Sequence, residues 1–114
     1  MHSIKNTVLL IGNLGKDPEL KKLDGGNSVA KFSLATNETF KNAKGEKVTS
    51  TQWHNCVLWG KTAELANTWL KKGKEIAARG KITYSNYEDK EGKVRYTTEI
   101  VIDEFTMLGP KPAN

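Results

Sequence analysis

The apolar residues of this chain occur in short runs, and this spacing constrains the fold more than any other feature. The runs hold about four to eight residues and are bounded by glycine, asparagine, aspartate or lysine, as is typical of strands joined by turns. No run approaches the roughly 18 apolar residues of a membrane span, and the N-terminal Met-His-Ser-Ile-Lys-Asn has no signal-peptide core. A chain of 114 residues forms one hydrophobic core. We therefore expect one sheet-rich domain without a membrane span.

The runs and the turns between them predict five strands and one helix. Turns are expected at Gly25-Gly26, at Lys44-Gly45-Glu46 and at Lys90-Glu91-Gly92-Lys93. The strands are expected at about 6–14, 28–40, 48–59 and 75–87, with the last running through 100–102 to 108, and the helix at 62–73. This is the element order of an all-β, five-stranded OB-fold Greek-key barrel with one α-helix between strands 3 and 4.

The predicted core follows from the alternation of side chains along each strand. The unbroken run Val8-Leu9-Leu10-Ile11 predicts that the first strand is buried on both faces, one of them against another subunit. Ala30, Phe32 and Leu34 alternate in the second strand and are expected to face the interior.

The helix prediction rests on its expected cap and on its apolar residues. Thr62 is the expected N-cap, and Gly73 is expected to end the helix. Trp69 follows Leu65 by four residues and precedes Leu70, so we expect it to pack in the core.

The segment from Trp53 to Trp59 carries the main functional signal. Residues six apart in a strand lie on the same face, about 20 Å from one another. If Cys56 and Leu58 face the core, then Trp53, Asn55 and Trp59 face solvent, where a nucleic-acid base is a suitable partner for an exposed indole. Two alternatives remain at this point: the opposite face is buried, or one tryptophan lies at a subunit contact.

Other aromatic residues fall into two groups. Phe40, near the end of the second strand, and Tyr87, which shares the parity of Lys81, Thr83 and Ser85, are expected to face solvent. Tyr96 and Phe105 are expected to be structural.

Charge gives only modest support for an anionic partner. The net charge is +5, but all but two of the 18 basic residues are lysine, and they are scattered. A lysine-rich surface that serves solubility is the alternative reading.

An enzyme is not expected. A zinc site or a reactive thiol would rest on His54 and Cys56, with His2 as a third ligand, yet Cys56 is predicted to be buried. Gly12-Asn13-Leu14-Gly15 lacks the lysine and hydroxyl residue of a P-loop. The single cysteine also suits a reducing compartment, the cytoplasm.

Several long segments resemble the bacterial single-stranded DNA-binding proteins. The resemblance covers about residues 4–108 through the segments VLLIGNLGKDPEL, FSLATNE, WHNCVLWGKTAELA, LKKG and RYTTEIVIDEFTMLG. It implies an OB-fold domain over residues 1–108 and a short flexible C-terminal end over 109–114. It further implies a homotetramer in the bacterial cytoplasm, associated with the nucleoid, that protects single-stranded DNA in replication, recombination and repair without a cofactor.

Carried over by position, the resemblance implies a single-stranded DNA site. The stacking aromatics of the family fall on Phe40, Trp53, Trp59 and Tyr87, and its phosphate-binding positions on Lys61 and Lys72. Asn55 is included in the expected surface, although the family often has a basic residue there, as at Ser85 and Asn86.

The C-terminal sequence departs from the family. Usual members continue into a flexible tail with an acidic tip that recruits replication and repair enzymes, whereas this sequence ends at Pro110-Lys111-Pro112-Ala113-Asn114. It is either the core of a longer protein or a tailless member, and recruitment by that route is not expected. A third hypothesis is an OB module that works mainly through protein partners.

Overall fold

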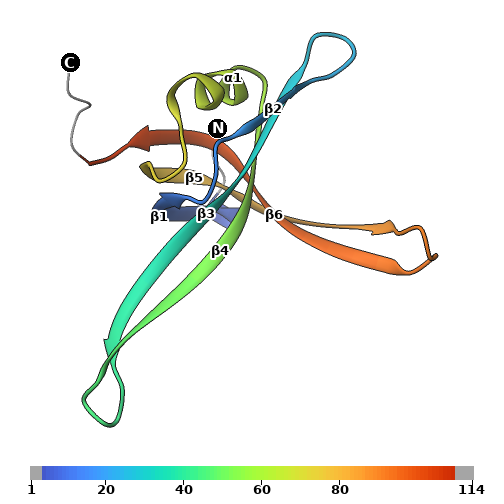
Figure 1. The fold of residues 1–114 in the computed structure, drawn as a ribbon. Helices are drawn as coiled ribbons and strands as arrows, with labels where there is room; N and C mark the ends of the chain where they lie inside the picture. The colour runs from blue at the N-terminus through green and yellow to red at the C-terminus, as the bar shows by residue number, and fades with distance from the viewer. Residues whose placement is uncertain (1–3, 110–114) are drawn as a thin grey trace.

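The computed structural model describes residues 4–109 and contains six strands, one α-helix and one short 3-10 helix (Figure 1). In chain order the elements are η1 (Ile4–Asn6), β1 (Val8–Leu14), β2 (Glu19–Lys22), β3 (Ser28–Lys41), β4 (Lys47–Trp59), α1 (Gly60–Trp69), β5 (Glu75–Glu88) and β6 (Val94–Met107). All five predicted strands are present. The short strand β2 was not predicted, because three of its four residues are charged and no apolar alternation marks it.

The strands close into a barrel. Their order is β1-β5-β6-β4-β3-β2, and β1 also pairs with β3, which joins the two ends of the five-stranded part. The β4–β6 pairing is parallel and the others are antiparallel. The predicted fold class, an all-β barrel with one helix between its third and fourth strands, is confirmed.

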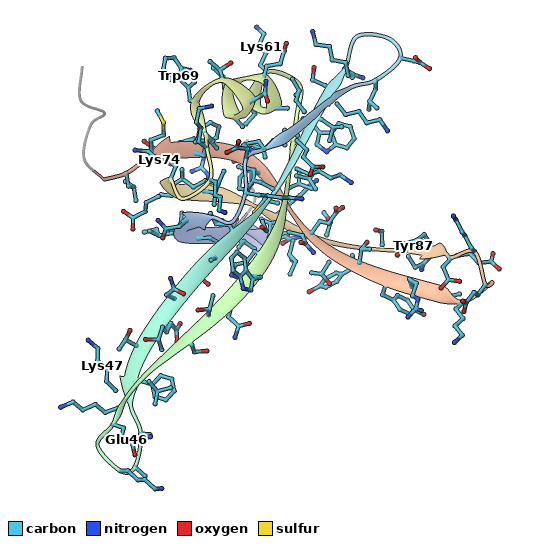
Figure 2. The ribbon with its side chains drawn as sticks, viewed as in Figure 1. Glu46, Lys47, Lys61, Trp69, Lys74 and Tyr87 are labelled. Atoms are coloured by element: carbon cyan, nitrogen blue, oxygen red, sulfur yellow. The ribbon has the colours of Figure 1, made fainter. Side chains whose placement is uncertain are left out.

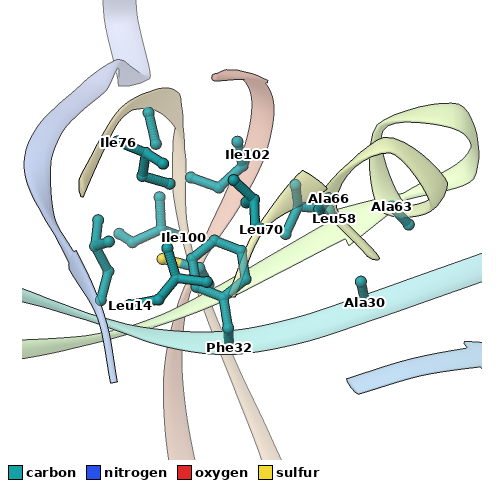
Figure 3. Packing of buried hydrophobic residues seen from close by; sticks show 13 residues of the cluster. Leu14, Ala30, Phe32, Leu58, Ala63, Ala66, Leu70, Ile76, Ile100 and Ile102 are labelled. Atoms are coloured by element: carbon teal, nitrogen blue, oxygen red, sulfur yellow. The ribbon is translucent and has the colours of Figure 1, made fainter. Parts of the chain in front are cut away.

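The barrel interior holds the residues that alternation predicted. Ala30, Phe32 and Leu34 of β3 are buried in the same core as Cys56 and Leu58 of β4, and Ala30 pairs with Leu58 and Phe32 with Cys56 across the sheet (Figure 3). Because Cys56 and Leu58 are buried, the alternative in which they lie on the surface is wrong.

The first strand is buried on one face within the single chain. Leu9 and Ile11 are exposed, while Val8 and Leu10 pack against the core. The predicted burial of the other face of β1 against a second subunit stays a prediction. Side chains two apart share a face, so one face of β1 meets the core and the other presents two aliphatic side chains to solvent.

The helix corrects three predictions. It begins at Gly60, after the extended residue Trp59, so Thr62 is not its cap. It ends at Trp69, and Gly73 lies in the following turn with a φ of 87°. Trp69 is exposed and not part of the core (Figure 2).

The helix spacing explains why Trp69 is exposed. The buried positions are Ala63 and Ala66, and Leu70 just beyond the helix continues the same stripe. This stripe repeats every three to four residues and leaves Leu65 and Trp69 together on the outer face.

Two long hairpins extend beyond the barrel (Figure 1). We call residues 36–52 the β3–β4 arm and residues 81–99 the β5–β6 arm. Both arms end in the same kind of turn: the side-chain Oδ1 of Asn42 accepts hydrogen bonds from the amides of Lys44 and Glu46, and Oδ1 of Asp89 accepts from Glu91 and Lys93. These local bonds favour the turns that the glycine pattern predicted.

Candidate nucleic-acid interface

Four aromatic rings that strand alternation placed outside the barrel are exposed. The exposed fractions of Phe40, Trp53, Trp59 and Tyr87 lie between 51% and 62%. Trp53 and Trp59 come from β4, whereas Phe40 lies near the tip of the β3–β4 arm, opposite Val48, and Tyr87 near that of the β5–β6 arm, opposite Arg95 (Figure 2). The predicted outward orientation is confirmed, and their role in binding stays a prediction.

The indole ring of Trp53 lies against Gly15, a residue without a side chain. A Cβ atom on Gly15 would be 2.5 Å from Cζ3 of the Trp53 ring, and 2.7 Å from the hydroxyl of Ser33. The indole therefore lies over the backbone of Gly15. Sequence reasoning missed this role, because the residue follows β1 and looked like an ordinary loop glycine.

Trp59 lies where β4 becomes the helix. It is the last residue of β4 and pairs with Val29 of β3, and it keeps an extended backbone with φ −120° and ψ 150°. Gly60 then begins the helix with a φ of 62°, a conformation that residues with a Cβ atom rarely adopt. Trp59 therefore keeps the position of a strand residue at the barrel surface, directly before the helix.

The predicted basic residues lie near the helix and not on the arms. Lys61 is exposed in the first turn of the helix, two residues after Trp59 (Figure 2). Lys72 is exposed in the turn before β5, where its backbone amide donates a 2.7 Å hydrogen bond to Oδ1 of Asp17. This bond fixes the backbone and leaves the ammonium group of Lys72 in solvent.

Asn55 is exposed on the same face of β4 as Trp53. It lines two shallow grooves, one of which also contains Lys16, Lys31, Glu19 and Glu99. The lysines in that groove are engaged by carboxylates: Lys16 with Glu19 at 3.0 Å and Lys31 with Glu99 at 3.8 Å. Part of the net positive charge is therefore neutralised locally.

Two more tyrosines are exposed on the β5–β6 arm. Tyr96 is 80% exposed and takes no part in the core of the single chain, and Tyr84, which sequence reasoning did not single out, is 73% exposed. Both lie on the part of the arm where β6 no longer pairs with β4. Their side chains share the sheet face of Ile100, but at this distance from the barrel that face has no core to pack against. Phe105 is partly buried against the core, in agreement with its predicted structural role.

Cys56 and His54 do not form a reactive centre. Cys56 is 1% exposed, and burial raises the pKa of its thiol to about 12, so the thiolate is suppressed at neutral pH. The ring Nε2 of His54 lies 2.9 Å from the hydroxyl of Thr36. Residues 4–109 contain no group of three metal-ligating side chains, and His2 lies outside the described residues.

The one α-helix of the described residues, α1, has ten residues. In the part of the chain that the structure describes, no helix is both long enough and apolar enough to span a bilayer.

Comparisons with known proteins agree with this geometry. Residues 5–108 match the model of the single-strand binding protein family. The chain is 43% identical over 107 residues to single-stranded DNA-binding protein 1 of Chlorobaculum tepidum, covering 93% of this chain and 66% of that protein. It is 41% identical over 109 residues to the single-stranded DNA-binding protein of Neisseria meningitidis, covering 96% of this chain and 63% of the relative. The chain thus spans a little under two thirds of the length of these relatives.

Solved structures give the same result. The Plasmodium falciparum SSB complex with ssDNA has a TM-score of 0.86 at 29% identity, covering 96% of this chain and 99% of that one. A deletion mutant of the single-stranded DNA-binding protein from Thermus aquaticus has a TM-score of 0.79 at 26% identity, covering 91% of this chain and 50% of that one. The chain belongs to the single-strand binding protein family.

Proposed function

We propose that this protein binds and protects single-stranded DNA, without reading its sequence and without catalysing a reaction, during replication, recombination and repair. Bases stack on Phe40, Trp53, Trp59 and Tyr87, while Lys61 and Lys72 meet phosphates and Asn55 contributes a polar group. The observation that carries the proposal is the exposure of four aromatic rings, two on β4 at the barrel and two on the arms that extend from it.

The physical basis is the difference between stacked and unstacked bases. An exposed indole leaves a large apolar surface in water, and a base covers that surface at a gain of about 1–3 kcal/mol. All four bases have a π face, so the gain does not depend on sequence. Bases of a duplex are already stacked on one another and are excluded, so the proposal requires preference for single strands.

We further propose that the protein is a homotetramer that acts in the bacterial cytoplasm, associated with the nucleoid. The exposed face of β1 supports self-association, since Leu9 and Ile11 project from it next to each other on the same face. A second copy that covers this face would remove both side chains from water. The mass of the protein in solution tests this part.

A second candidate function is an OB module that acts through protein partners. The observation that favours it is a groove of about 270 Å³ lined by Leu65, Trp69 and Phe105, with Asp103 and Glu104 beside them. Arg79 pairs with both carboxylates, at 3.6 Å to Asp103 and 2.7 Å to Glu104, so this groove suits a peptide mainly through its apolar lining. Such a module would leave the fluorescence of Trp53 and Trp59 unchanged when DNA is added.

Fluorescence titration tests the two candidates. We expect a long thymidine homopolymer to quench tryptophan emission strongly and to saturate, and duplex DNA to leave it nearly unchanged. Trp69→Phe removes the one indole that lies outside the proposed site and provides the control, because quenching of Trp53 and Trp59 must persist in this variant. Trp53→Ala and Trp59→Ala should each weaken binding by about 5- to 150-fold. Absent quenching, or an equal response to duplex, would favour the partner-binding module.

A further inference from the structure

A groove lies where the two arms separate. β4 and β6 pair only at Cys56–Ile100, Val57–Val101 and Leu58–Ile102, so the residues before these positions diverge into a fork. A groove of about 320 Å³ occupies the fork, and its lining comes from β4, β5 and β6. We call it the fork groove, and its lining includes Trp53, Asn55, Ile82, Tyr96, Thr98 and Ile100.

Two exposed rings line the fork groove from different strands. Trp53 comes from β4 and Tyr96 from β6, and they are 62% and 80% exposed. A single exposed ring is common on protein surfaces. Here two rings line one groove. One comes from β4 and the other from β6, at a point where these strands no longer pair, so the groove has aromatic surface on two sides.

The rest of the lining suits the edge of a nucleobase. Ile82 and Ile100 are cross-strand partners and supply an apolar floor. The side-chain amide of Asn55 and the hydroxyl of Thr98 have no hydrogen-bond partner within residues 4–109, so donors and acceptors are available beside the rings.

Charge separates this groove from its neighbour. Among the described residues no carboxylate lines the fork groove, whereas in the adjacent groove Glu19 and Glu99 pair with Lys16 and Lys31 and offset their positive charge. The volume of the fork groove equals that of about ten water molecules. One pyrimidine base has a similar number of non-hydrogen atoms and fits this space.

We propose that the fork groove holds one unstacked nucleobase and that Tyr96 is a fifth stacking residue, acting on the same base as Trp53. The inference rests on the proposed binding of single-stranded DNA and adds a position to it. Asn55 and Thr98 face the edge of the base, and the aliphatic floor excludes water beneath it.

The test compares Tyr96 with an equally accessible tyrosine on the same arm. Tyr84 is 73% exposed but does not line the fork groove, so Tyr84→Ala is the matched control. Affinity is measured by anisotropy of a labelled oligothymidylate at one fixed salt concentration. We expect Tyr96→Ala to weaken binding about fivefold or more, Tyr96→Phe to stay within about twofold because the ring remains, and Tyr84→Ala to stay near wild type.

A double-mutant cycle tests whether the two rings share a base. If they do, Trp53→Ala and Tyr96→Ala together weaken binding by less than the product of their separate factors, whereas Trp53→Ala and Tyr84→Ala multiply. Fully independent factors for Trp53 and Tyr96, or equal losses from Tyr84→Ala and Tyr96→Ala, would overturn the shared site. A change of molecular mass in Tyr96→Ala would assign the groove to a subunit contact and also overturn it.

Failure of this inference is distinct from failure of the proposed function. If Tyr96→Ala binds like wild type while Trp53→Ala is weakened, only the fork site is wrong. If the wild-type protein does not bind the oligothymidylate, the proposed function is wrong as well.

Discussion

The backbone of Gly15 lies beneath the indole ring of Trp53, so closely that a single added Cβ atom would come within 2.5 Å of the ring. The glycine and the tryptophan come from different parts of the barrel, just after β1 and within β4. The orientation of a ring in the proposed binding surface thus depends on the absence of a side chain 38 positions earlier in the chain.

Gly15→Ala should therefore impair binding by displacing Trp53. The new methyl group also comes within 2.7 Å of the Ser33 hydroxyl, so the exposed ring is the neighbour that is free to move. We expect an affinity loss for oligothymidylate of about the size of Trp53→Ala, roughly 1–3 kcal/mol. Anisotropy titration measures it. In a Trp53→Ala background, Gly15→Ala should have no further effect on affinity, and a further loss there would contradict this mechanism.

Removal of the Phe32 ring should destabilise the protein far more than removal of the Trp69 ring. Phe32 is buried in the barrel, so Phe32→Ala leaves a cavity and should lower the free energy of unfolding by about 3–5 kcal/mol. Trp69 is exposed on the helix, so Trp69→Ala should change that free energy by no more than about 0.5 kcal/mol. Urea denaturation of both variants measures the difference. A large loss for Trp69→Ala would show that its ring is covered in the assembled protein.

Salt dependence should report the phosphate contacts of Lys61 and Lys72. Each contact to a single strand contributes about −0.7 to the slope of log affinity against log salt concentration. Lys61→Ala and Lys72→Ala should each make the slope less steep by about that amount. The hydrogen bond from Lys72 to Asp17 uses the backbone amide and survives the substitution. Lys44→Ala, at the tip of the β3–β4 arm, serves as the comparison, and equal changes for all three lysines would indicate only a general charge effect.

The buried thiol of Cys56 should make stability fall at high pH. Its pKa rises from 9.0 to about 12 on folding, so the folded state binds the proton more tightly than the unfolded state. The contribution is fully present below pH 9.0 and is lost as the pH rises from there towards 12. Thermal unfolding at intervals from pH 8 upward measures it. Cys56→Ala lacks this component and keeps every other ionisable group, so an identical pH profile in the variant would contradict the assignment.

Much of the fold was determined by the sequence alone. Period-two alternation predicted that Phe32 in 28–40 faces the core, and in 48–59 it placed Cys56 and Leu58 on one face, which their burial preference favoured as the core face. Glycine-containing turns predicted both arm tips, since asparagine or aspartate and glycine satisfy these turns through local bonds. The outward orientation of Trp53 and Trp59 followed from the same alternation.

The tertiary structure decided features that no local pattern contains. Alternation placed Tyr96 on the same face as Ile100, but only the divergence of β4 and β6 determines that this face has no core above it at Tyr96. Trp69 lies outside the buried stripe because the helix contacts the barrel through Ala63, Ala66 and Leu70, and this contact depends on how the helix docks. The approach of Gly15 to Trp53 likewise arises from barrel closure, which brings together strands that are distant in sequence. Local sequence thus sets the period and the turns, whereas burial at the ends of elements depends on what the closed barrel places beside them.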